Sequence, residues 1–321
     1  MKRKLNLVGN NTLTVSLPSK WTKKYNLNKG DEIDLEEIGP ELRINFSKNN
    51  IKKQITINLD EEVTTSLVWR YIKAAYISGY DTIIISFKTE KIKYTSKGKT
   101  IGQKSDLMPI NDLMHSIGIR FFGMVIVDQN HNKFILKDLG TSDELDVKGI
   151  FKKVFSQVKT LSETVKEVAD TRNKENFANV LALENNINRL TDYGLRILNK
   201  RNKNEEGDHN LHFILETLES IGDSFYDIFE QVIKQNLELT EESKNSFNKL
   251  VILFNNFYET YLFKKKNLIL VHNESKKLNL ELDLNPTNHL NIKFKLISDL
   301  IKSSIGPELI KLCETKLVEE D

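Results

Sequence analysis

The stretch LNLVGNNTLTVSLPSKWTKKYNLNKGDEI, residues 5 to 33, decides how the start of the chain folds. Leu5 and Leu7 alternate with polar neighbours, which predicts a strand, and the alternation resumes at Leu13 after a polar turn. Pro18 suits the first turn of a short helix because it has no N–H group to satisfy there. A glycine turn then leads into two more predicted strands, so residues 1–47 are expected to form a small β-rich domain.

The charge of this domain is one-sided. The first thirty residues contain seven basic residues and no acidic one, and six acidic residues follow between positions 31 and 41. Fewer than about fifty residues with short strands bury too little apolar surface to be stable alone. We therefore expect the domain to need a partner.

The bulk composition describes an ordinary globular protein. A chain of 321 residues is expected to form about two or three domains. Apolar residues make up 39% and charged residues 29%, which excludes a disordered chain, and the net charge of +2 indicates no particular partner. The single cysteine, Cys313, excludes an intrachain disulfide. No signal sequence or membrane-spanning run is evident, so a cytoplasmic location is expected.

Two further segments follow the β-rich domain. Residues 50–145 alternate strand and helix patterns, as expected of a small α/β domain, with one helix ending at Gly79 and another around residues 107–117. Gly98 and Gly102 lack the spacing of a phosphate-binding loop. Residues 147–321 predict a helical bundle. Its helical patterns cover residues 147–170, 173–202, 208–237, 241–270 and 289–318, and the fold class is therefore α+β.

An acidic stripe marks the helix predicted over residues 209–233. At about 100° per residue one face of this helix carries His212, Glu216, Glu219, Asp223, Asp227 and Glu230. Like charges four residues apart oppose each other by about 0.2–0.5 kcal/mol per pair. Hydration, a basic partner surface or a metal ion could each compensate for this repulsion.

The preceding predicted helix carries a second row of oxygen-bearing side chains. Glu184, Asn188 and Asp192 are four residues apart, and they would face the acidic stripe if the two helices packed side by side. Carboxylate oxygens suit hard cations, which makes a metal site a hypothesis. The six histidines form no nucleophile or zinc-protease motif, so an enzyme is not expected.

Two parts of the sequence resemble known families. The stretch GNNTLTVSLPSKWTKKYNLNKGDEI is similar to the amino-terminal domain of AbrB/SpoVT/MazE-type DNA-binding proteins. The helical part resembles the phosphate-uptake regulator PhoU, whose E-R-I-G-D motif has its counterpart in Glu219-Ser-Ile-Gly-Asp223. The stretch WRYIKAAYISGYDTIII resembles the linking domain of archaeal PhoU-type regulators that carry an AbrB-like head.

The resemblance implies a transcriptional regulator of phosphate uptake that is a homodimer through a swapped-hairpin head. It implies a divalent or ferric metal ion held through E-x-x-x-D motifs, one of which matches Glu219 and Asp223, whereas Asn188 replaces the expected acid of the other. The residues expected to touch DNA phosphates are Arg3, Lys4, Lys20, Lys23 and Lys24. The alternative is a protein-interaction regulator that docks on a phosphate transporter or sensor and uses its head only to dimerise.

Overall fold

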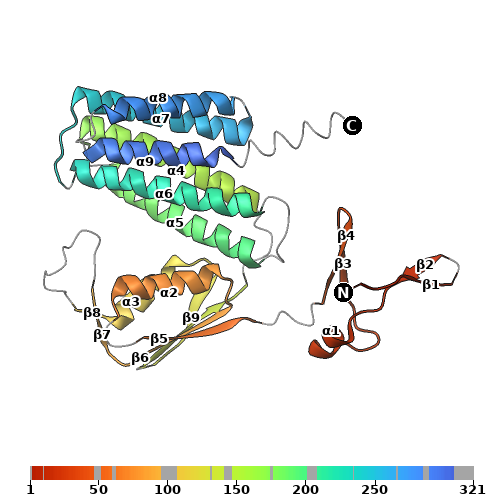
Figure 1. Ribbon diagram of the computed structural model, residues 1–321. Helices are drawn as coiled ribbons and strands as arrows, with labels where there is room; N and C mark the ends of the chain where they lie inside the picture. Colours follow the sequence, from red (N-terminus) through yellow and green to blue (C-terminus); the bar gives the residue numbers. More distant parts are fainter. Residues whose placement is uncertain are drawn as a thin grey trace. The chain divides into compact units, whose positions relative to one another are not determined.

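The computed structural model describes residues 2–9, 11–46, 52–59, 63–94, 107–130, 132–140, 147–173, 176–200, 208–233, 235–264, 267–284 and 289–306. The chain divides into two compact units, Met1–Lys52 and Lys53–Asp321. The fold is α+β, with small sheets in the amino-terminal half and long helices in the carboxy-terminal half (Figure 1).

The first unit consists of two hairpins and one short helix, which confirms the elements predicted from its alternation. Its elements are β1 (Asn6–Val8), β2 (Thr12–Thr14), α1 (Ser19–Lys24), β3 (Asp34–Ile38) and β4 (Glu41–Asn45). β1 pairs with β2 and β3 with β4, both antiparallel. Helix α1 ends because Asn26 takes a left-handed conformation (φ 51°) and the Leu27 amide donates to the Thr22 carbonyl at 2.9 Å.

The second unit begins with a four-stranded sheet in the order β5-β6-β10-β9. Its strands are β5 (Gln54–Leu59), β6 (Thr82–Phe87), β9 (Met124–Asn130) and β10 (Lys133–Asp138). β5 is parallel to β6, and the other neighbours are antiparallel. Helices α2 (Thr65–Ile77) and α3 (Ile110–Arg120) cover one face of the sheet (Figure 1). Along β5, β6 and β10 buried side chains alternate with more exposed ones, as expected of strands with one covered face.

One boundary in this part differs from the sequence expectation. The helix expected from residue 107 begins at Ile110, because residues 107–109 form strand β8 (Leu107–Pro109), which pairs with β7 (Lys91–Lys93). Pro109 is the N-cap residue, with φ −58°, so its missing N–H group is tolerated at this junction. Gly79 ends α2 as predicted. Its φ is +80°, and an added Cβ would lie 2.7 Å from Lys200 Cγ, so only glycine fits there.

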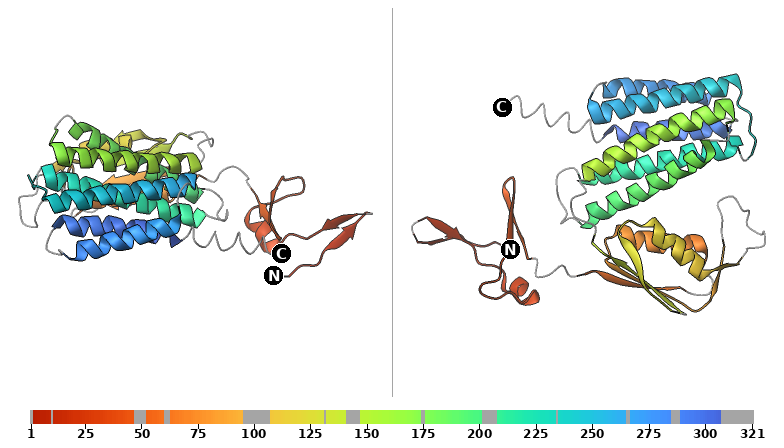
Figure 2. Two further views of the ribbon diagram at one scale, coloured as in Figure 1. Left: turned by 90° about the horizontal axis from the view of Figure 1, so that it is seen from above. Right: turned by 180° about the vertical axis from the view of Figure 1, so that it is seen from behind.

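The helical part holds α4 (Val147–Thr171), α5 (Phe177–Lys200), α6 (Asp208–Ile233), α7 (Glu241–Phe263), α8 (Leu268–Asp283) and α9 (His289–Ser304). These helices pack side by side as a bundle (Figure 2). Phe155 of α4 stacks on Phe254 of α7 at the centre of its core. The apolar face predicted for α6 is buried against the bundle, since Ile214, Leu218 and Phe225 are each 0% exposed.

The sequence expectation was wrong for the helix over 241–270. Lys264 takes a left-handed conformation (φ 53°) and ends α7, and the Asn267 side chain then accepts a hydrogen bond from the Ile269 amide and starts α8. Helix α8 was not expected. The last helix ends at Ser304, and the part of its predicted pattern from residue 307 on, with Cys313, lies outside the described residues. Among the described helices, none combines the length and apolar content that a membrane crossing requires.

Candidate nucleic-acid interface and ionic clusters

The basic residues of the first unit lie on its surface. Lys20, Lys23 and Lys24 lie on α1, which has no acidic residue in its first turn, and all three are exposed. Arg3 and Lys4 are exposed on the chain that leads into β1. Within the described residues none of the five has an ion-pair partner. The five cations expected to meet phosphates are therefore open to solvent in a single chain.

The described residues of the first unit form no buried core. None of its described side chains is buried, and eight large apolar ones are exposed, whereas others such as Trp21 and Phe46 are half-buried. Leu7 and Leu13 face each other across the β1–β2 hairpin and are 65% and 61% exposed. Leu35 of β3 and Leu42 of β4 are 59% and 55% exposed. Burying such a side chain contributes about 1.5–3 kcal/mol, so one copy of this unit lacks the hydrophobic stabilisation that these four leucines could supply.

Two lysines from other helices compensate part of the acidic stripe of α6. Glu219 Oε1 lies 2.7 Å from Lys73 Nζ of α2. Asp227 Oδ2 lies 2.7 Å from Lys293 Nζ of α9. The chain itself thus supplies the opposite charge at these two positions, which is a compensation that the helix sequence alone does not indicate.

Lys73 is the centre of a cluster where α2, α3, α5 and α6 meet, which we call the Lys73 cluster (Lys73, Arg120, Asp192 and Glu219). Lys73 Nζ also lies 3.0 Å from Asp192 Oδ1, and Arg120 Nη2 lies 3.4 Å from Asp192 Oδ2. The side chain of Asp192 is 1% exposed, that of Glu219 18% and that of Lys73 35%. Two buried or half-buried carboxylates from adjacent bundle helices therefore share one ammonium group from the α/β part.

The cluster shifts the pKa values of both ends of its shortest ion pair. Burial alone would lower the pKa of Lys73, but Glu219 and Asp192 outweigh it and raise that pKa above its ordinary value. Burial raises the pKa of Glu219; the Lys73 ammonium opposes this rise, whereas Asp192 and Asp223 add to it. The Lys73 ammonium therefore favours the charged form of Glu219.

A metal ion does not fit the Lys73 cluster as it is arranged. The position between Asp192 and Glu219 is taken by the Lys73 ammonium, which a metal ion would have to displace. Within the described ranges, no group of three or more His, Cys, Asp or Glu side chains is arranged to hold a metal ion. Metal binding at these helices stays a prediction.

The other expected metal ligands have partners of their own. The Asn188 amide nitrogen donates to Glu184 Oε1 at 2.7 Å along α5. Glu216 is exposed, with one oxygen 3.6 Å from His212 Nδ1 on α6. Asp223 is half-buried on α6, close enough to Glu219 for its charge to affect that carboxyl. The structure thus brings Asp192, Glu219 and Asp223 together and leaves Glu216 and Asp227 apart from them.

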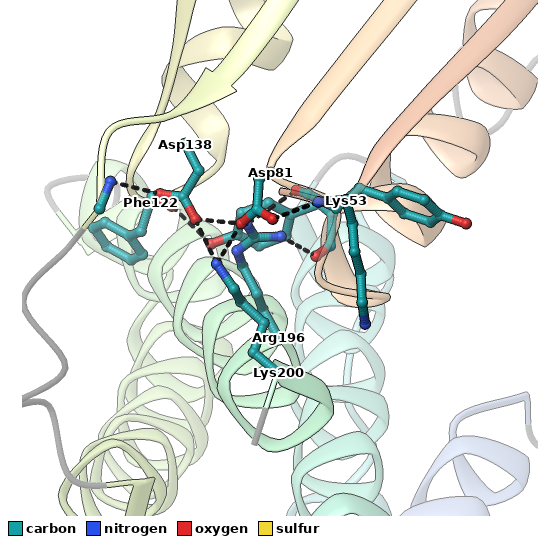
Figure 3. A network of polar contacts seen from close by, with 9 residues as sticks. Lys53, Asp81, Phe122, Asp138, Arg196 and Lys200 are labelled. Atoms are coloured by element: carbon teal, nitrogen blue, oxygen red, sulfur yellow. Dashed lines mark hydrogen bonds and ion pairs between the residues drawn. The ribbon is translucent and has the colours of Figure 1, made fainter. Parts of the chain in front are cut away.

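A second ionic cluster, the Arg196 network (Asp81, Asp138, Arg196 and Lys200), joins α5 to the sheet. Asp81 and Asp138 point from the strand ends toward Arg196 and Lys200 (Figure 3). Arg196 Nη2 donates to Asp138 Oδ2 at 2.7 Å, and Lys200 Nζ donates to Asp81 Oδ1 at 2.6 Å. Asp81 also accepts the Lys53 amide at 2.8 Å, so the first residue of the second unit is fixed by the same network.

Arg196 also caps the end of α2. Its Nη1 donates to the Tyr76 carbonyl at 2.6 Å and its Nη2 to the Tyr80 carbonyl at 3.0 Å, while Asn199 donates to the Ile77 carbonyl at 3.0 Å. The last carbonyls of a helix lack partners within the helix, so donors at this end are stabilising. The Gly79 amide also donates to the Tyr76 carbonyl at 3.0 Å, and Tyr80 lies just beyond the helix. The Arg196 side chain is only 3% exposed.

Sequence reasoning missed Lys73 and Arg196, although each leaves a signal. Lys73 lies in the apolar stripe formed by Trp69, Ile72 and Tyr76, at the spacing i, i+3, i+4, i+7. A lysine inside such a stripe needs a buried partner. Arg196 follows Asp192 by one helical turn in a segment that is otherwise mostly apolar, which is the corresponding signal on α5.

No protein family, curated protein or solved structure matches the chain in comparisons with known proteins.

Proposed function

We propose that the protein is a DNA-binding regulator that acts as a homodimer through its first unit. Two features of the described residues carry the proposal: five exposed cations have no ion-pair partner, and no side chain of the unit is buried. A second copy of the same unit would supply the missing core and double the positive charge. Such a surface suits the phosphate backbone of duplex DNA, whose affinity for proteins comes largely from neutralised phosphates.

The regulated process that we propose is phosphate uptake, and this part rests on the resemblance of the helical part to PhoU. It is tested by measuring DNA affinity with and without inorganic phosphate at constant ionic strength. A change in affinity supports the link to phosphate, and equal affinities count against it while leaving DNA binding itself untouched.

Neutralising the lysines of α1 is expected to reduce the salt dependence of DNA binding. The variant is Lys20→Gln/Lys23→Gln/Lys24→Gln. Each neutralised phosphate contributes about 0.9 to the slope of log affinity against log salt, so removing three lysines from each of two protomers lowers the slope by up to about 5. Fluorescence anisotropy with a random-sequence duplex at several salt concentrations measures the slope.

The matched control is Lys152→Gln/Lys153→Gln, which removes two exposed lysines from α4 in the bundle. We expect its slope to equal that of the unchanged chain. If the chain shows no salt-dependent binding at any concentration tested, DNA is not its partner.

Polar substitution in the first hairpin is expected to break the dimer. In Leu7→Asn/Leu13→Asn the two exposed leucines no longer gain from burial against a second copy, a loss of about 3–6 kcal/mol per protomer. Analytical ultracentrifugation should then show a monomer where the unchanged chain is a dimer. Ile119→Asn is the control, because Ile119 is 75% exposed in the second unit. A dimer that survives the double substitution would place the interface elsewhere.

Exposed apolar residues on the bundle favour a second candidate function, docking on another protein. Leu280 and Leu284 at the end of α8 are 62% and 85% exposed, and Ile292 and Leu296 on α9 are 58% and 45% exposed. In that case the first unit only dimerises, and DNA affinity shows no dependence on the α1 lysines. The partner would be a transporter or sensor protein, which remains the alternative proposal.

A further inference from the structure

Strands β7 and β8 form a two-stranded ribbon (Figure 1), and β7 carries two exposed lysines, Lys91 and Lys93. Lys91 pairs with Pro109 and Lys93 with Leu107, in antiparallel register. Ile92, between the two lysines, is 6% exposed and belongs to the hydrophobic core. Successive side chains of a strand point to opposite faces, so Lys91 and Lys93 lie on the face opposite to Ile92. We call this the outer face of the ribbon, and both lysines are exposed.

The ribbon belongs to the second lysine-rich stretch of the chain. Between Glu90 and Asp106 the sequence has five lysines and no acidic residue. Outside the first thirty residues, no other acid-free stretch of the sequence has as many basic residues. Neither Lys91 nor Lys93 has an ion-pair partner among the residues that the structure describes. Both ammonium groups are therefore available to an anion.

The ribbon lies at the opposite end of the sheet from the point where the chain enters it. β5 and β6 run parallel, with Gln54 opposite Thr82 and Leu59 opposite Phe87. β7 follows β6 directly in the chain, whereas Lys53 precedes β5. A strand of six residues is about 20 Å long, so about this distance separates the ribbon from Lys53.

We propose that the outer face of this ribbon, with Lys91 and Lys93, is a second contact for the phosphate backbone of duplex DNA. The proposal rests on the proposed DNA-binding function and adds to it a contact in the second unit. The major groove of B-DNA is about 12 Å wide and admits a two-stranded ribbon, and lysines along such a ribbon reach the phosphates beside it. Phosphate contacts position a protein without reading sequence.

Two contacts on one chain strengthen each other. Once the first unit is bound, the ribbon meets the duplex at the effective concentration that the connection between the units sets, so even weak contacts add to the overall affinity. Lys91 and Lys93 would therefore matter for affinity and for salt dependence, although neither is part of the first unit.

The test measures DNA binding of the full-length chain with a random-sequence duplex at several salt concentrations. The variants are Lys91→Gln/Lys93→Gln and, as the matched control, Lys152→Gln/Lys153→Gln. We expect the ribbon variant to lower the salt slope by about 1.8 if one protomer's ribbon touches the duplex and by about 3.6 if both do. Because both side chains are exposed, its thermal unfolding should match that of the unchanged chain.

The outcomes separate this proposal from the proposed function. If the α1 variant loses the salt slope and the ribbon variant keeps it, the ribbon contact is wrong and DNA binding by the first unit stands. If the unchanged chain does not bind DNA, both are wrong. Binding of the same variants to vesicles with anionic lipid is measured in parallel. A loss of vesicle binding alone would mean that the ribbon serves a membrane surface, which also overturns the proposal.

Discussion

Replacing Arg196 with methionine is expected to lower the free energy of unfolding of the second unit by about 3–5 kcal/mol. The substitution leaves the Asp138 carboxylate, which is 10% exposed, with the Lys200 ammonium and the Gly140 amide as its remaining partners. It also removes the Arg196 hydrogen bonds to the Tyr76 and Tyr80 carbonyls, of which Tyr76 keeps its bond from the Gly79 amide. Urea unfolding followed by circular dichroism measures the change.

The variant Arg196→Lys tests whether the charge of Arg196 alone stabilises the fold or whether the geometry of its guanidinium group is needed as well. Lysine keeps the positive charge but has no planar fork, so it cannot bond two carbonyls and a carboxylate at once. We expect the free energy of unfolding of Arg196→Lys to fall by about 1–2 kcal/mol, which is the net contribution of one or two hydrogen bonds. Arg70→Met, on the exposed face of α2, is the control and should change stability by less than about 0.5 kcal/mol.

The same network predicts a pH dependence. Burial alone would raise the pKa of Asp138, but hydrogen bonds from Arg196, Lys200 and the Gly140 amide outweigh it and lower that pKa below its ordinary value of 3.8. A carboxyl group with a lowered folded-state pKa stabilises the fold above its unfolded pKa, and this contribution is lost as pH falls through the folded value. The difference between the unchanged chain and Arg196→Met should therefore shrink below about pH 4. A constant difference down to acid pH would contradict the assignment.

Replacing Lys73 with methionine is expected to destabilise the protein by about 2–3 kcal/mol at pH 7.5, somewhat less than for a fully buried pair because the Lys73 side chain is 35% exposed. The variant leaves Asp192 and Glu219 facing each other without the Lys73 ammonium between them. The pKa of Glu219, already raised, rises further. The folded state then binds protons more readily than the unfolded chain, so stability recovers as pH falls.

Unfolding of Lys73→Met at pH 7.5 and pH 5 measures this recovery. Adding Glu219→Gln to Lys73→Met should restore part of the lost stability at pH 7.5, because it removes one of the opposed charges. Lys166→Met breaks an ion pair with Asp170 on α4 and is the control, with an expected loss of about 0.5 kcal/mol or less. Equal losses at both pH values would show that Lys73 acts through packing and not through charge.

The first unit was largely predictable from its sequence because its signals are local. Alternation around Leu7 and Leu13 gives the first hairpin, and the four-residue spacing of Trp21 and Tyr25 gives α1, where the two rings lie 5.6 Å apart. The exposure of its apolar side chains in a single chain also agrees with the expectation that the unit needs a partner.

The charges that compensate the acidic stripe could not be predicted from the sequence of its own helix. Its face on α6 was placed correctly, but the compensating charges come from Lys73, 146 residues earlier, and Lys293, 66 residues later. A helical wheel contains no information about which distant helix packs against a face. The sequence therefore suggests hydration, a basic partner surface or a metal ion as the compensator, and it does not indicate an internal lysine.

The predicted helix boundaries were wrong where polar residues continue an amphipathic pattern. Lys264 has an ordinary helix propensity, so nothing in its identity predicts the left-handed turn that separates α7 from α8. Asn267, a favoured N-cap residue, was the available signal for the start of α8. Strand β8 was missed because three residues are too few to show a period of two.

The Lys73 ammonium is a cation that the chain carries with it. A bound ion can be diluted away, exchanged or removed by a chelator, but a lysine side chain remains at a fixed local concentration as long as its helix is folded. The contact between α2 and the two bundle helices that Lys73 holds is thus formed as the chain folds, without waiting for any solute.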